Sequence, residues 1–172
     1  MQTRRGVLGL GLLAPLAIAG CGWEPLYADR ETGPADAELG AIKVDPISDR
    51  SGQRLALGLR RSLNPAGGAI PVRYVLHTTL TVSRQDLGVQ SQGLGTLGRV
   101  DLSATFTLAD TKTGGVLLTN SIHTADSFDI VANEYSTVVA EEDARNRALE
   151  ELRRDMVDKL TLFMQRRVAH TT

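Results

Sequence analysis

Residues 72–84, VRYVLHTTLTVSR, alternate between apolar and polar side chains more cleanly than any other part of the chain. The apolar side chains would lie on one side of an extended strand: Val72, Tyr74, Leu76, Leu80 and Val82. The opposite side would carry polar side chains: Arg73, His77, Thr79, Thr81 and Ser83. A period of two residues indicates a β-strand that packs one face on a core. This stretch therefore predicts a sheet with one apolar and one polar face.

Three further segments predict the other strands of this sheet. Residues 99–110, RVDLSATFTLAD, repeat the alternation with five inward positions: Val100, Leu102, Ala104, Phe106 and Leu108. The turn sequence DTKTGG (110–115) then leads into a strand through Val116, Leu118 and Ile122. A short first strand would contain Ile42 and Val44 and end at Asp45-Pro46, because the residue before proline is restricted.

Two segments have helical periodicity. The first carries Leu55, Leu59 and Leu63 on one face; Asp49 or Ser51 would cap it, and Asn64-Pro65 would end it. The second, residues 134–167, would be about 50 Å long at 1.5 Å per residue. Its apolar stripe consists of Leu149, Leu152, Met156, Leu160 and Phe163.

The order strand, helix, three strands, helix predicts an α+β two-layer sandwich. We expect one mostly antiparallel four-stranded sheet with both helices on its apolar face, so that the other face is bare and polar. Residues 85–98, QDLGVQSQGLGTLG, are interpreted as a long hairpin loop. Gly93, Gly95 and Gly98 match the spacing of a dinucleotide-binding fingerprint, but that motif requires a helix to follow, and here a strand is expected.

The N-terminal residues 1–20 have the features of a cleaved export signal. Arg4 and Arg5 precede an apolar run from Val7 to Ala19, which is shorter than the roughly 20 residues of a membrane-spanning helix. The run ends in Ile18-Ala19-Gly20-Cys21, which resembles the lipobox of bacterial lipoproteins. This resemblance implies that Cys21, the only cysteine of the chain, carries a covalent lipid. The start TRRGVLG also fits a twin-arginine signal, so both export routes remain open.

The mature chain would consist of a lipidated N-terminus and tether at 21–38 and one globular α+β domain at 39–172. Loss of Arg4 and Arg5 lowers the 19 basic residues to 17 against 20 acidic ones, a net charge near −3. No basic stripe with interleaved aromatic residues is present, which argues against nucleic-acid binding.

No catalytic or metal site is predicted, because the three histidines lack ligand spacing and the sequence contains no Gly-x-Ser-x-Gly nucleophile elbow. Arg84, Arg99 and Lys112 would lie at strand ends or turns, where they could contact phosphates of an anionic lipid head group. The alternative for each is an ordinary surface cation.

Cys21-Gly22-Trp23 followed by Pro25-Leu26-Tyr27 resembles the start of the LptE family of lipopolysaccharide-assembly lipoproteins, in its alphaproteobacterial form. Further similarity lies in three segments: 49–63, 99–110 and 134–152. The resemblance implies a non-enzymatic, cofactor-free lipoprotein on the periplasmic side of the outer membrane. It would plug and help assemble a β-barrel lipopolysaccharide translocon of the LptD type, and take part in lipopolysaccharide transport.

In that setting the resemblance implies that Trp23, Pro25, Leu26 and Tyr27 pack near the bilayer interface or the barrel wall; packing on the domain's own core is the alternative. Two other functions remain open. An auxiliary lipoprotein of an ABC-type lipid transporter would share the anchor and the size, and a membrane-anchored periplasmic hydrolase would show a catalytic cleft.

Overall fold

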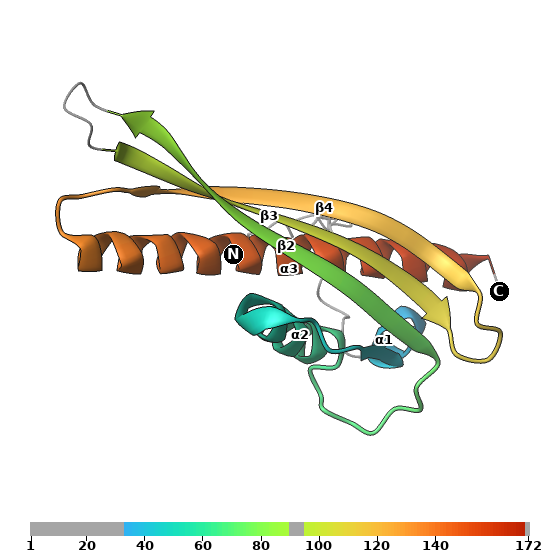
Figure 1. The fold of residues 1–172 in the computed structure, drawn as a ribbon. Coiled ribbons are helices and arrows are strands. Elements are labelled where there is room, and N and C mark those ends of the chain that lie inside the picture. The colour runs from blue at the N-terminus through green and yellow to red at the C-terminus, as the bar shows by residue number, and fades with distance from the viewer. Residues whose placement is uncertain (1–32, 90–94, 171–172) are drawn as a thin grey trace, which may run out of the picture.

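Three long strands form most of a four-stranded sheet in the computed structural model, which describes residues 33–89 and 95–170 (Figure 1). The elements in chain order are α1 (Pro34–Gly40), β1 (Ile42–Val44), α2 (Asp49–Leu63), β2 (Tyr74–Val89), β3 (Gly95–Asp110), β4 (Val116–Asp129) and α3 (Glu134–Ala169). The strand order is β1-β2-β3-β4, with β1 parallel to β2 and the other neighbours antiparallel. The predicted α+β class and mostly antiparallel sheet are confirmed.

The sheet register explains why the alternating residues form one core. Leu76 pairs with Leu108, and Leu108 with Leu118, so inward side chains of successive strands lie side by side. All five inward positions predicted on β3 are fully buried. Three apolar residues depart from the prediction: Val72 precedes β2 and is exposed, Val82 is exposed within β2, and Val116 is exposed at the start of β4.

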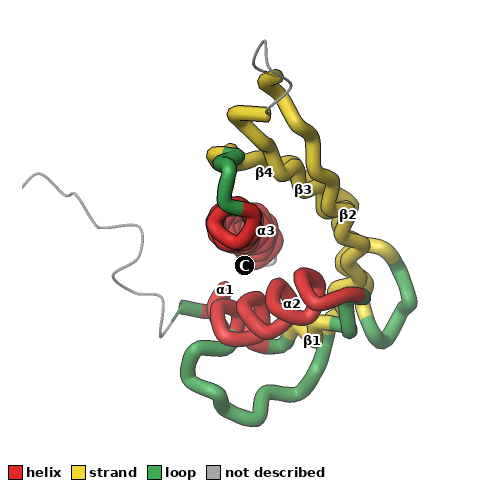
Figure 2. Tube along the Cα trace, turned by 60° about the vertical axis from the view of Figure 1, so that its left-hand side comes forward, coloured by secondary structure: helices red, strands yellow, loops and turns green. Residues whose placement is uncertain are grey.

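The helices cover the apolar face of the sheet as predicted. Helix α3 runs along β3 and β4, and α2 lies beside α3 and next to β1 (Figure 2). The predicted stripe of α3 is buried from Leu149 to Leu160, and Phe163 is partly buried against the core. Asn133 caps α3, its side chain accepting a hydrogen bond from the backbone N–H of Ser136.

Helix α2 is joined to α3 by both packing and polar contacts. Its N-cap is Ser48 rather than Asp49 or Ser51, and Asn64 is the C-cap. Arg54 donates to the side chains of Glu142 and Asn146 on α3. Gly58 lies where the Arg153 side chain of α3 crosses α2: a Cβ there would lie 2.7 Å from Arg153 Cδ. The glycine inside this helix is thus explained by helix–helix packing.

Two elements differ from the sequence expectations. The polar segment before Leu39 contains a short helix, α1, which was not predicted; its Leu39 is buried in the core. The long loop expected at 85–98 is wrong, because β2 continues to Val89 and β3 begins at Gly95. Towards the hairpin, β2 and β3 diverge from α3 (Figure 1).

Candidate functional site

The outer face of the sheet, opposite the helices, is almost entirely polar over five consecutive cross-strand rows. We call this surface the polar face. Its rows are His77-Thr107-Thr119, Thr79-Thr105-Ser121, Thr81-Ser103-His123, Ser83-Asp101-Ala125 and Gln85-Arg99-Ser127. Only Ala125 is not polar. Since no element of the described chain covers it, the polar face is available to a partner.

Charged groups on the polar face pair within the sheet. His77 Nδ1 lies 2.8 Å from an Asp45 oxygen near β1. Further along, Asp101 Oδ1 lies 2.9 Å from Arg99 Nη2 and 3.4 Å from His123 Nε2. Isolated surface ion pairs of this kind contribute little stability, roughly 0–1 kcal/mol each. Their main effect is a polar face with little uncompensated charge.

The Arg99–Asp101 pair leaves hydrogen-bonding capacity unused. Arg99 Nε and Asp101 Oδ2 are both buried atoms without a hydrogen-bond partner among the described residues. Arg99 does lie on the polar face, within β3 rather than at its end. It is the only one of the three predicted head-group candidates that does so.

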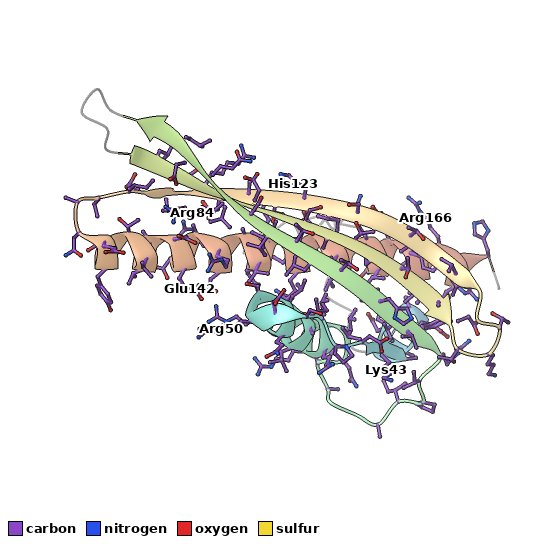
Figure 3. All side chains as sticks on the ribbon, viewed as in Figure 1. Lys43, Arg50, Arg84, His123, Glu142 and Arg166 are labelled. Carbon is purple, nitrogen blue, oxygen red and sulfur yellow. The ribbon has the colours of Figure 1, made fainter. Side chains whose placement is uncertain are left out.

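Arg84 lies on the opposite face of the sheet from Arg99. It pairs with Glu141 of α3 at 3.1 Å and with Asp86 at 3.2 Å, and its guanidinium carbon lies 5.4 Å from the centre of the Phe128 ring. Figure 3 shows Arg84 between the sheet and α3, whereas His123 projects from the other side of β4. The alternation of the sequence already indicates this placement, because Arg84 is an even-numbered residue like Leu80 and Val82, which lie on the helix side of the sheet.

Lys112 lies in the turn between β3 and β4, exposed to solvent. In this turn Asp110 Oδ1 accepts hydrogen bonds from the backbone N–H groups of Lys112, at 2.7 Å, and Thr113, at 3.1 Å. These two bonds lower the pKa of Asp110. From Arg99 to Asp110, β3 spans roughly 35 Å. The structure therefore does not bring Arg84, Arg99 and Lys112 together.

At this same end of the sheet, where Tyr74 pairs with Asp110, α1 joins the N-terminal part of the chain to the core. Tyr74 Oη donates a 2.7 Å hydrogen bond to Glu38, which also pairs with Arg73. Burial, reinforced by this hydrogen bond, raises the pKa of Tyr74. Cys21, Trp23, Pro25, Leu26 and Tyr27 lie outside the described residues, so their predicted roles stay predictions.

Exposed apolar side chains, which were not predicted, occur at the hairpin end of the molecule. They come from β2, β3, the loop between β4 and α3, and the start of α3: Leu87, Leu97, Val131, Tyr135, Val138 and Val139. Tyr135 is 77% exposed. The spacing of Tyr135, Val138 and Val139 is that of an apolar helix face, but the sequence could not show that this face stays exposed.

The described part of the chain offers little for catalysis or metal binding. Within residues 33–89 and 95–170, no group of three or more His, Cys, Asp or Glu side chains converges as a metal site would require. A groove of about 430 Å³ lies between α1 and the end of α2, with mainly apolar residues such as Leu39, Leu63 and Ile70 along its walls. No helix in these ranges combines the length and apolar content of a membrane span.

Solved structures share this architecture. A lipoprotein from Caulobacter crescentus superposes with a TM-score of 0.62 at 22% identity, covering 78% of this chain and 98% of its own. The rare lipoprotein B from Shewanella oneidensis gives 0.52 at 13% identity, covering 76% and 97%. A minor lipoprotein from Acinetobacter baumannii gives 0.50 at 16% identity, covering 70% and 88%. At these identities the likeness shows the fold alone.

A search of curated proteins found no match. The family model "LptE: Lipopolysaccharide-assembly", in contrast, matches residues 39–163, from the end of α1 to near the end of α3. The match spans the sheet and both long helices, and the family is non-enzymatic and cofactor-free, as predicted. The chain therefore belongs to the LptE family of lipopolysaccharide-assembly lipoproteins.

Proposed function

We propose that this protein is the lipoprotein subunit of the lipopolysaccharide translocon in the outer membrane. It is anchored on the periplasmic side through a lipid on Cys21. Its globular domain plugs a β-barrel partner of the LptD type and helps that barrel assemble. Family membership supports the role in lipopolysaccharide assembly and a place in the cell envelope.

The polar face is the observation that carries this proposal. The interior of a large membrane barrel is polar, in contrast to its apolar outer band. A domain that sits inside such a lumen needs a wide surface of small polar side chains and little net charge. The five rows of the polar face supply both, because their Ser and Thr residues dominate and their ionic groups are paired.

The structure does not gather the proposed lipopolysaccharide contacts into one site. Arg99 and Lys112 are accessible, but far apart, and Arg84 is held by Glu141. Any contact with head-group phosphates therefore uses single cations rather than one three-residue site. Binding of purified lipopolysaccharide to Arg99→Ala and Lys112→Ala, compared with Arg61→Ala on the exposed side of α2, tests this contact. Equal binding by all three variants would remove both residues as candidates.

Purification of the tagged, lipidated protein from its own membranes in mild detergent tests the main proposal. Mass spectrometry should find a large outer-membrane β-barrel at equal stoichiometry. Recovery of inner-membrane transporter subunits would instead support the auxiliary-lipoprotein function, and recovery of the protein alone would contradict the plug. Mutation of Cys21 to Ala should release the protein from the membrane fraction; continued membrane attachment would contradict lipidation at that residue.

A further inference from the structure

The two edges of the sheet differ in how their outward backbone groups are satisfied. β4 forms one edge; the other is formed by β1 as far as Leu76 and by β2 alone beyond it. Alternate residues of a strand direct both N–H and C=O to the same neighbour, so every second residue faces the edge. An unsatisfied edge is a template for another strand.

Side chains protect the β4 edge at two of its outward backbone positions, Ser121 and Ser127. The edge-facing N–H of Ser121 donates to Asn120 Oδ1 at 2.8 Å, and that of Ser127 donates to Asp126 Oδ1 at 2.7 Å. The carbonyl oxygen of Ser127 accepts a 3.5 Å hydrogen bond from Arg147 of α3. These local bonds compete with strand addition along β4.

The β2 edge has no such protection. The N–H of Asp45 donates to the carbonyl oxygen of Leu76, which fixes the backbone of Leu76 toward the β1 side. By alternation, Thr78, Leu80, Val82 and Arg84 face the same side, beyond the end of β1. Across the described ranges, neither a strand nor a side chain hydrogen-bonds to these four backbone positions. The free edge is about 20 Å long at 3.3 Å per residue.

The side chains along this edge define what an added strand would need. On the helix side lie Leu80, partly buried, and Val82, 36% exposed. On the other side, Thr79 and Thr81 belong to the polar face. A strand added here would continue both surfaces, so it would place apolar residues toward the helices and small polar residues outward.

We propose that an extended segment of the barrel partner adds to the sheet along Thr78–Arg84. This inference rests on the proposed function, because the polar face runs without interruption into the β2 edge. A protein that encloses the polar face also borders this edge. Pairing at the edge would fix the rotation of the domain within its partner, which the uniform rows of the polar face do not.

Substitutions at Val82 test the pairing in the lipidated full chain. Val82→Pro removes one edge-facing N–H but no bond to β3, and proline is tolerated on edge strands where its nitrogen faces solvent. Val82→Lys places a charge that opposes strand addition while keeping the N–H. The matched control, Val82→Ala, keeps the backbone donor and adds no charge. We expect at least tenfold less co-purified barrel with the first two variants and wild-type recovery with the control.

Barrel recovery at the wild-type level with Val82→Pro and Val82→Lys would overturn the inference while leaving the proposed function intact. No barrel with the wild-type protein would contradict both. A wild-type dimer that becomes monomeric in Val82→Pro would show that a second copy, not the barrel, occupies the edge. Should either variant unfold, hydrogen exchange of residues 77–86 in the wild-type protein decides the question. Exchange should slow when the barrel is bound, and unchanged exchange would overturn the pairing.

Discussion

The two faces of the sheet are built from adjacent residues of the same strands, but one face stabilises the fold and the other is exposed. On β3, Phe106 is fully buried under the helices, whereas its neighbour Thr105 lies on the polar face. Burial of an aromatic side chain stabilises the fold by several kcal/mol, and an exposed threonine contributes little. The side chains of the polar face, at odd-numbered positions of the three long strands, can therefore vary to bind a partner with little effect on the stability of the fold.

The largest difference between the faces should come from truncating these two neighbours. Phe106→Ala should lower the free energy of unfolding by about 3–5 kcal/mol, because it leaves a cavity in the core. Thr105→Ala should change it by less than about 0.5 kcal/mol. Urea denaturation of both variants measures the contrast. Similar losses would mean that the polar face contributes to folding after all.

Close packing of the core face can be tested at Gly98. A Cβ there would collide with the ring of Phe128, so Gly98→Ala should destabilise by about 1–3 kcal/mol through overpacking. Gly68→Ala is the control, since its Cβ would have no atom within 4 Å. The thermal midpoints of both variants report the difference. Adding Phe128→Leu to Gly98→Ala should recover part of the loss, and no recovery would point to a backbone cause.

A smaller effect is expected where the helices meet outside the core. The hydrogen bond from Arg54 lowers the pKa of Glu142, so the ionised carboxylate stabilises the fold. This contribution is present above the pKa of Glu142 in the unfolded chain and is lost as the pH falls through its lower pKa in the folded chain. Because the side chain of Glu142 is 36% exposed, solvent screening should limit the effect to roughly 0.5 kcal/mol.

Glu142→Gln should therefore reduce stability at pH 7 and lose this deficit in acid. Glu151→Gln, on the exposed side of α3, is the control and should follow the wild-type profile. Unfolding free energies measured from pH 2 to pH 7 provide the test. A deficit that stays constant across this range would show that the charge of Glu142 is not involved.

The smallest change in stability, with the largest effect on the partner, is expected at the centre of the polar face. Ser103→Trp should leave the free energy of unfolding within about 0.5 kcal/mol of wild type. Its bulk should nevertheless reduce the amount of barrel recovered with the protein. Ser103→Thr retains a small polar side chain and should recover the barrel normally. Normal recovery with tryptophan would place the barrel contact on another surface.

The sequence predicted the elements whose pattern is long and regular. The alternation in β3 and the stripe of α3 each extend over many residues, so single exceptions do not hide them. Helix α1 is too short, at seven residues, for helix propensity to stabilise it alone. It depends on contacts made by residues distant in sequence, such as Tyr74 with Glu38, which no local pattern reveals.

The extent of the β2–β3 hairpin was missed for a related reason. Glycine is depleted in strands in general, so the glycines among residues 85–98 favour a loop. Hydrogen bonding to a neighbouring strand can nevertheless continue a strand through them. The face on which each candidate cation lies follows from its position in the alternation. Arg84 is an even-numbered residue and Arg99 an odd-numbered one, and they lie on opposite faces of the sheet. The exposure of the apolar side chains around Tyr135 depends on which part of α3 the rest of the fold covers, and no local pattern shows this.

The bonds of Glu38 to Tyr74 and Arg73 determine how the domain would respond to mechanical force. With the proposed lipid on Cys21, tension on the chain would act through Gly33, and therefore first through α1. The contacts of Glu38 would bear this load before any strand of the sheet does. Tension on the tether should thus detach α1 as a separate early step and lengthen the segment between the anchor and the rest of the domain. The sheet and α3 would remain folded and would keep their contacts with the proposed barrel partner.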